Sequence, residues 1–189
     1  MSLRAPALVM LVGVSLAGCS DATDPGDAVT VSGVIENRNA ATIPANARVV
    51  VLWTVSFGSP DYSFVFGTGT VSPGGQFSIT FDGPPPAAAL NNGTLGVGLV
   101  LLTSDQSLTE GQLPSNYSFP GLLGFSEDHS IIYRSGTTGI DWANGFPADY
   151  SVGEVQRSNV GFDSFMPVGL DDLRVVVDVI QNLNPPNWT

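Results

Sequence analysis

The sequence predicts an all-β fold, a single antiparallel β-sandwich of about eight strands. Three observations predict it. Apolar residues recur at every second position in most segments after residue 28, which places them on one face of a strand. The chain contains 22 glycines and 14 prolines, which favour turns and interrupt helices. No segment longer than ten residues has a convincing helical period.

Eight segments have strand character. In 76–82, Phe77, Ile79 and Phe81 alternate with polar residues, and the other segments are rich in β-branched and aromatic residues. In chain order, the predicted strands lie at 29–36, 47–57, 63–71, 76–82, 94–104, 129–135, 149–156 and 173–180. The "SPGG" run at 72–75 predicts a tight hairpin between the third and fourth of them. The breakers "GSPD", "DGPPP" and "SGTTG" predict further loops.

The first residues of the chain predict a secretory signal peptide. Arg4 is the only positive charge before a 14-residue apolar stretch at 5–18. A membrane-spanning helix needs about 20 apolar residues, so this stretch is too short to remain as a span. It suits the hydrophobic region of a signal peptide, and the small residues Ala17 and Gly18 then lead to Cys19, the only cysteine.

The "LAGC" run at 16–19 resembles the lipobox of bacterial lipoproteins. The resemblance implies that the Cys19 thiol carries a diacylglycerol, that the peptide is cut before Cys19, and that the new amine is acylated. Because Ser20 rather than Asp follows the cysteine, it also implies the outer membrane. Ordinary signal cleavage with an unused thiol is the alternative. The predicted organisation is a signal peptide at 1–18, the lipidated cysteine and a flexible tether at 19–28, and the β-sandwich at 29–189.

Residues 29–86 show a second, looser resemblance, to transthyretin-like and carboxypeptidase-regulatory-like β-sandwiches and to small YbaY-type lipoproteins. The shared pattern is a strand with Gly33, a loop with Pro44, a further strand, and "GQFSI" at 75–79. The chain departs from the pattern where "GPPPAAALNNG" replaces the usual next strand signal. The resemblance implies a sandwich architecture and carries no activity with it.

Composition excludes several classes of function. The net charge is −11, and all six basic residues are arginines. Such an acidic chain is a poor partner for nucleic acid, whose phosphates must be neutralised. Without lysine, Schiff-base chemistry and a Walker P-loop are excluded. No catalytic residue, metal ligand or cofactor is therefore assigned.

His129 is the single histidine, whereas zinc catalysis usually takes two or three. It follows Glu127 and Asp128, so a histidine–carboxylate pair is conceivable, and a solvated loop is the alternative. The segment "DQSLTEG" at 105–111 is similar to a calcium loop with alternating oxygen ligands. It departs from the calcium pattern because Glu110 stands where glycine is required, and an ordinary polar loop is the alternative.

The segment "DWANGFPADY" at 141–150 is the candidate binding surface. It brings Asp141, Trp142, Phe146 and Tyr150 into one loop that contains glycine and proline. Aromatic side chains in loops stack on sugars or on protein partners. They also cap the end of a sandwich, because large aromatics bury the most area.

These features predict a membrane-anchored envelope lipoprotein, a non-catalytic binding or scaffolding module whose partner is an envelope protein or a glycan. The alternative is an envelope hydrolase, with a glycan as substrate, that uses paired carboxylates. The 17 acidic residues offer too many pairs to select one from the sequence. An enzyme should have a deep cleft with convergent acids of perturbed pKa, whereas a scaffold should have a shallow or flat surface.

Overall fold

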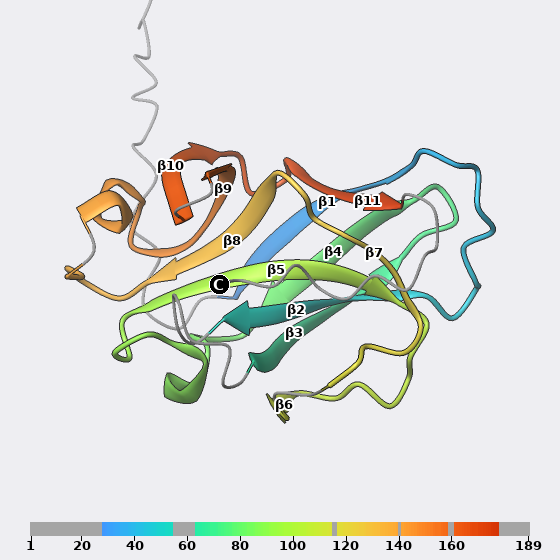
Figure 1. Cartoon of the computed structure of the whole chain (residues 1–189), viewed down its shortest axis with the longest axis horizontal. Helices are drawn as coiled ribbons and strands as arrows, with labels where there is room; N and C mark the ends of the chain where they lie inside the picture. Colours follow the sequence, from blue (N-terminus) through green and yellow to red (C-terminus); the bar gives the residue numbers. More distant parts are fainter. Residues whose placement is uncertain (1–27, 55–62, 115–116, 140, 159–160, 178–189) are drawn as a thin grey trace, which may run out of the picture.

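The computed structural model describes residues 28–54, 63–114, 117–139, 141–158 and 161–177, and the fold is all-β (Figure 1). The predicted signal peptide and nearly all of the predicted tether lie outside these ranges, as do the side chains at 54, 141–142, 155–158 and 161–165. The strands are β1 (Val29–Asn37), β2 (Arg48–Thr54), β3 (Ser63–Val71), β4 (Gln76–Phe81), β5 (Leu95–Thr103), β6 (Gly111–Leu113), β7 (Leu122–Phe125), β8 (His129–Arg134), β9 (Asp149–Ser158), β10 (Gly161–Val168) and β11 (Leu173–Val177). Two short 3₁₀ helices, η1 (Ala87–Ala89) and η2 (Asp141–Gly145), accompany them.

All eight predicted segments contain strands, namely β1 to β5, β8, β9 and β11. Residues 55–57 and 178–180, at the ends of two of them, lie outside the description. Three strands were not predicted. β6 and β7 are only three and four residues long. β10 contains Pro167, which cannot donate to a strand ladder, and its pairing is irregular between Phe162 and Ser164.

The sheet closes on itself, in the order β5-β2-β3-β4-β1-β11-β7 and back to β5. The prediction of an all-β fold is confirmed, and the sheet forms a seven-strand barrel with further strands attached instead of an open eight-strand sandwich. Closure depends on the parallel pairing of β1 with β11, in which Gly33 lies opposite Leu173. Alternating apolar residues mark the inner face of a barrel and of a sandwich equally, so the pattern does not reveal closure.

The sheet forks at Ser126, between β7 and β8. β2 pairs with one edge of β5, and β8 and β7 pair in succession with the other edge. At the junction, the Ser126 N–H donates to the Val100 carbonyl at 2.8 Å, and the Val100 N–H donates to the Ser126 hydroxyl at 3.1 Å. Beyond the fork, β7 continues to β11, whereas β8 continues to β9 and β10. The three strands β8 to β10 thus extend from the barrel on one side (Figure 1).

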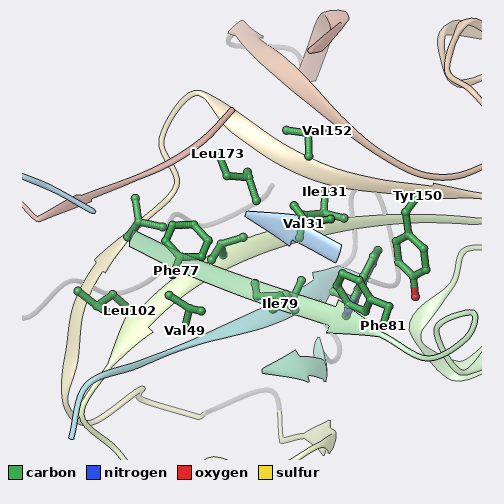
Figure 2. Packing of buried hydrophobic residues seen from close by; sticks show 14 of the residues in the cluster. Val31, Val49, Phe77, Ile79, Phe81, Leu102, Ile131, Tyr150, Val152 and Leu173 are labelled. Carbon is green, nitrogen blue, oxygen red and sulfur yellow. The ribbon is translucent and has the colours of Figure 1, made fainter. Parts of the chain in front are cut away.

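The main core fills the barrel and the angle of the fork (Figure 2). Val31 and Leu173 from the closing strands face Ile131 and Val152 from β8 and β9 in this view. All four side chains are at most 1 % exposed. The angle of the fork is therefore packed with apolar side chains at these four positions.

β5 is buried on both faces along all nine of its residues. Its Val100 and Leu102 belong to the main core. Its Leu99 and Leu101 belong to a second cluster, which also contains Leu108, Leu113, Phe119 and Leu122 from the loops and the strands β6 and β7 that follow β5. This double burial explains why the strand is an almost unbroken apolar run rather than an alternating one.

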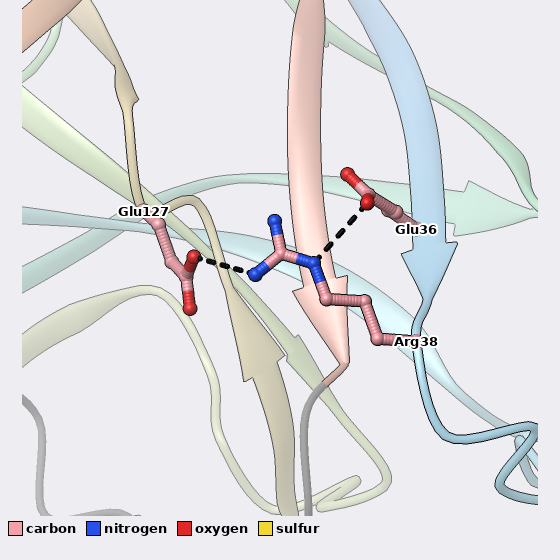
Figure 3. Close-up of polar contacts among 3 residues, drawn as sticks. All are labelled: Glu36, Arg38 and Glu127. Carbon is pink, nitrogen blue, oxygen red and sulfur yellow. Dashed lines mark hydrogen bonds and ion pairs between the residues drawn. The ribbon is translucent and has the colours of Figure 1, made fainter.

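Arg38 forms ion pairs with two acidic side chains on the side of the barrel where β1 pairs with β11 (Figure 3). Its Nε lies 3.1 Å from a Glu36 carboxylate oxygen, and its Nη1 lies 3.2 Å from an oxygen of Glu127. Glu36 belongs to β1 and Glu127 to the turn before β8, so the guanidinium spans the strand β11 between them. All three side chains are well exposed, and such pairs stabilise a fold by about 1 kcal/mol at most.

Candidate functional site

The predicted binding segment at 141–150 contributes two of its aromatic side chains to the core. Phe146 is 2 % exposed and packs with Leu95, Val97 and Ile132. Tyr150 is 8 % exposed and belongs to the main core. These two residues therefore follow the capping alternative and are not part of an exposed aromatic surface. Asp141 and Trp142 lie in η2, and their side chains are outside the described part of the chain.

The loop between β8 and β9 is held by side-chain hydrogen bonds. Arg134 donates from Nε to the Phe146 carbonyl at 3.0 Å and from Nη1 to the Gly136 carbonyl. The Asn144 carboxamide accepts from the Thr138 N–H at 2.9 Å and donates to the Thr138 carbonyl at 3.0 Å. The Asn144 side chain thus makes the same two hydrogen bonds to the Thr138 backbone that a neighbouring strand would make, and these bonds hold the Thr138 backbone in place.

A shallow hollow lies between this loop and the turn that leads into β5. Its volume is about 200 Å³, and its lining is Asn91, Asn92, Thr94, Leu95, Thr138 and Gly139. Leu95 is 1 % exposed and packs in the core with Val97, Ile132 and Phe146, so it presents almost no surface to the hollow. None of these six described lining residues is charged. As far as the described residues line it, the hollow is therefore a small neutral site with polar walls.

The turn on one side of the hollow is a tight one. The Asn91 N–H donates to the Leu95 carbonyl at 2.7 Å, and the Leu95 N–H donates back at 3.3 Å. Asn92 and Gly93 between them have φ of 50° and 70°, a conformation that asparagine and glycine adopt most readily. The Ser135 N–H donates to the Thr94 carbonyl at 2.8 Å, which fixes this turn to the end of β8.

The Asn91 and Asn92 carboxamides make no hydrogen bond with any residue in the described ranges. Each carboxamide offers two donors and an acceptor oxygen. Asn91 and Asn92 were not among the residues predicted from the sequence to form a site. Asn–Gly is a dipeptide typical of turns, but no sequence signal places this turn against a loop some 45 residues further along the chain.

The candidate calcium loop uses its two carboxylates for hydrogen bonds within the protein. Asp105 accepts from the Ser107 N–H and hydroxyl at 2.8 and 2.7 Å and from the Tyr117 hydroxyl at 2.9 Å. The Ser107 hydroxyl is the main cause that lowers the pKa of Asp105. Glu110 instead accepts from the Gly67 N–H on β3 at 3.1 Å. The two acids therefore do not converge, and no group of three or more metal-ligating side chains occurs in the described ranges.

His129 begins β8, and its register partner on β9 is Glu154. Its Nδ1 is buried and has no hydrogen-bond partner. Its sequence neighbour Glu127 is engaged by Arg38. A catalytic histidine needs a partner that orients one ring nitrogen, and the described residues supply none at Nδ1.

Comparisons with protein-family models, with curated proteins and with solved structures find no match to this chain. Within the part of the chain that the structure describes, neither short 3₁₀ helix approaches the length and apolar character of a membrane span, and no other helix occurs there.

Proposed function

We propose that this chain is a lipid-anchored, non-catalytic binding module of the bacterial cell envelope. The observation that carries the proposal is the run "LAGC" at 16–19, with Arg4 and a 14-residue apolar stretch before it and an acidic, polar segment after it. A lone cysteine placed there has a purpose as the site of the lipid, whereas a lone cysteine in a secreted protein otherwise needs a separate explanation.

The anchor keeps the domain near its membrane. One acyl chain holds a protein only marginally, and each buried CH₂ contributes about 0.8 kcal/mol, so a diacylglycerol with a further acyl chain attaches it permanently. The segment 20–28 has nine residues and reaches at most about 30 Å when extended. The barrel therefore operates at the membrane surface, and its partner is an envelope protein or a glycan. Ser20 after the cysteine favours the outer membrane.

Binding is preferred to catalysis because of what four of the described carboxylates do. Asp105 has its pKa lowered, the opposite of what a general acid needs. Glu36 and Glu127 hold Arg38, and Glu110 accepts from the β3 backbone. The neutral hollow beside the 136–146 loop is the place we propose for the ligand.

Cys19→Ala tests the anchor. We expect the variant to appear in the soluble envelope fraction or to remain unprocessed, while Ser15→Ala, a change within the apolar stretch, leaves the protein membrane-bound. Retention of Cys19→Ala in washed membranes, at the wild-type level, would contradict the proposal.

Separation of inner and outer membranes by density tests the location. We expect the wild-type protein in the outer-membrane fraction, and we expect Ser20→Asp to move part of it to the inner membrane. Sedimentation of the wild-type protein with inner-membrane markers would overturn the outer-membrane assignment without affecting the anchor.

A further inference from the structure

We propose that the hollow at the start of β5 binds one neutral pyranose ring of an envelope glycan, with the Asn91 and Asn92 carboxamides as its hydrogen-bonding groups. This inference rests on the proposed binding function and gives it a ligand class. Three observations support it: the residues that line the hollow, the hydrogen bonds that hold their backbone, and the Asn91 and Asn92 carboxamides without a partner among the described residues.

The chemistry of the lining matches hydroxyl groups. A sugar hydroxyl donates one hydrogen bond and accepts others, and a carboxamide does both. Asn91 and Asn92 have no partner among the described residues, so a ligand replaces water rather than a protein contact.

The size and charge of the hollow select against other ligands. Its volume of about 200 Å³ is below the roughly 300–1,000 Å³ typical of pockets for drug-sized molecules, so it admits one small ring and not a folded chain segment. None of its described lining residues is charged, in a chain with a net charge of −11. A charged ligand therefore finds no counter-ion among these residues, and an anionic one is repelled by the chain as a whole.

The hollow is also preorganised. The reciprocal bonds between Asn91 and Leu95 fix one wall. The two bonds from the Asn144 carboxamide fix Thr138 in the opposite wall, and the bond from Ser135 to Thr94 joins the two walls. Binding therefore orders little more than two side chains, which limits its entropic cost.

The test is a titration of the purified, lipidated full chain in a zwitterionic detergent, since a detergent with a sugar headgroup would compete. The probes are N-acetylglucosamine, its β-1,4-linked oligomers and glucose, with glucuronic acid as the charged control. The variant is Asn91→Ala with Asn92→Gly, because glycine accepts the positive φ at position 92. Asn46→Ala is the matched control, since Asn46 is exposed and its carboxamide donates to Ser104, outside the hollow.

We expect saturable binding of a neutral probe with a Kd on the order of 1 mM, weaker binding of glucuronic acid, and a Kd at least tenfold higher in the double variant. Asn46→Ala should bind as the wild type does, and all three proteins should melt at the same temperature. Absence of saturable binding by every neutral probe, or an unchanged Kd in the double variant, would overturn the assignment of the hollow.

Sedimentation with isolated peptidoglycan sacculi and pull-down from detergent-solubilised envelopes separate this failure from that of the proposed function. If wild type and double variant capture the same envelope component equally, the chain is a binding module and the hollow is not its site. If neither protein captures any envelope component, both proposals fail.

Discussion

The ring of Tyr150 lies flat against the ring of Phe81, with centroids 4.3 Å apart and 14° between the planes. The Tyr150 hydroxyl donates to the Gly83 carbonyl at 2.7 Å. This contact joins β9, in the extension beyond the fork, to the end of β4 in the barrel. Trp53 and Tyr133 meet the same tyrosine edge-on, at 6.3 and 5.0 Å. One aromatic residue thus connects the two parts of the sheet.

Tyr150→Phe removes one hydrogen bond and preserves the stacking. We expect the free energy of unfolding at pH 7 to fall by about 1 kcal/mol. Tyr150→Ala also removes the ring from the core and should cost about 3–5 kcal/mol. Urea denaturation measures both, and equal losses for the two variants would show that the stacking contributes nothing.

The stability of the wild type and of Tyr150→Phe should also depend differently on pH. Burial raises the pKa of Tyr150 above its ordinary value of 10.0. The folded state then holds a proton that the unfolded state releases, so this contribution to stability is complete below about pH 10 and is lost as the pH rises further. Tyr150→Phe lacks the group, so the stability difference between wild type and variant should shrink above about pH 10. A difference that stays constant up to pH 11 would contradict the buried position.

Gly33→Ala tests how the barrel closes. A Cβ at Gly33 would lie 2.2 Å from the Leu173 carbonyl oxygen, and because this atom belongs to the backbone, only movement of β1 against β11 relieves the clash. We expect a loss of about 1–3 kcal/mol or more, measured by urea denaturation. Gly145→Ala is the control, since nothing lies within 4 Å of the Cβ position there. A Gly33→Ala protein as stable as this control would contradict the parallel pairing.

The sequence predicted strands where alternation was strong, and it predicted neither closure nor the fork. Phe77, Ile79 and Phe81 have the same period of two in a barrel and in a sandwich, and the alternation within one strand does not identify the strand it pairs with. β1 pairs with β11 from the opposite end of the described chain. β7 has only four residues, too few to show a period.

The candidate site was harder to predict than the fold. Phe146 and Tyr150 lie in a segment with glycine and proline and suggested a surface loop, but their apolar area is buried against the sheet. Asn91 and Asn92 form a turn, and their chemistry depends on the loop that meets them in space. Neither loop's own sequence indicates that the two loops are in contact in the fold.

Asp105→Asn should change stability on the acid side. The Ser107 hydroxyl first, and then the Ser107 N–H, the Tyr117 hydroxyl and the charge of Arg48, lower the pKa of Asp105 below its ordinary 3.8. The ionised carboxylate then stabilises the fold above about pH 4, and this contribution is lost as the pH falls through the lower folded value. We expect Asp105→Asn to unfold more easily at pH 7 and to show a weaker loss of stability between pH 4 and pH 2.

Tyr117→Phe is the matched variant for this prediction, because it removes one of the three hydrogen bonds to Asp105 and keeps the charge. Its acid dependence should lie between those of wild type and Asp105→Asn. Identical acid unfolding curves for all three proteins would refute the role of this carboxylate.

Two buried serines, Ser126 at the fork and Ser130 in β8 just beyond it, should respond in opposite ways to alanine. The Ser126 hydroxyl accepts from the Val100 N–H, so Ser126→Ala leaves a buried donor unpaired and should cost about 1–3 kcal/mol. The Ser130 hydroxyl is buried with no partner, so Ser130→Ala removes an unsatisfied group and should leave stability unchanged or raise it. The two residues are four positions apart and 0 and 1 % exposed, which makes each the control for the other. Urea denaturation of both variants tests the fork: equal effects, of either sign, would show that the Ser126 hydroxyl does not hold β5 at the junction.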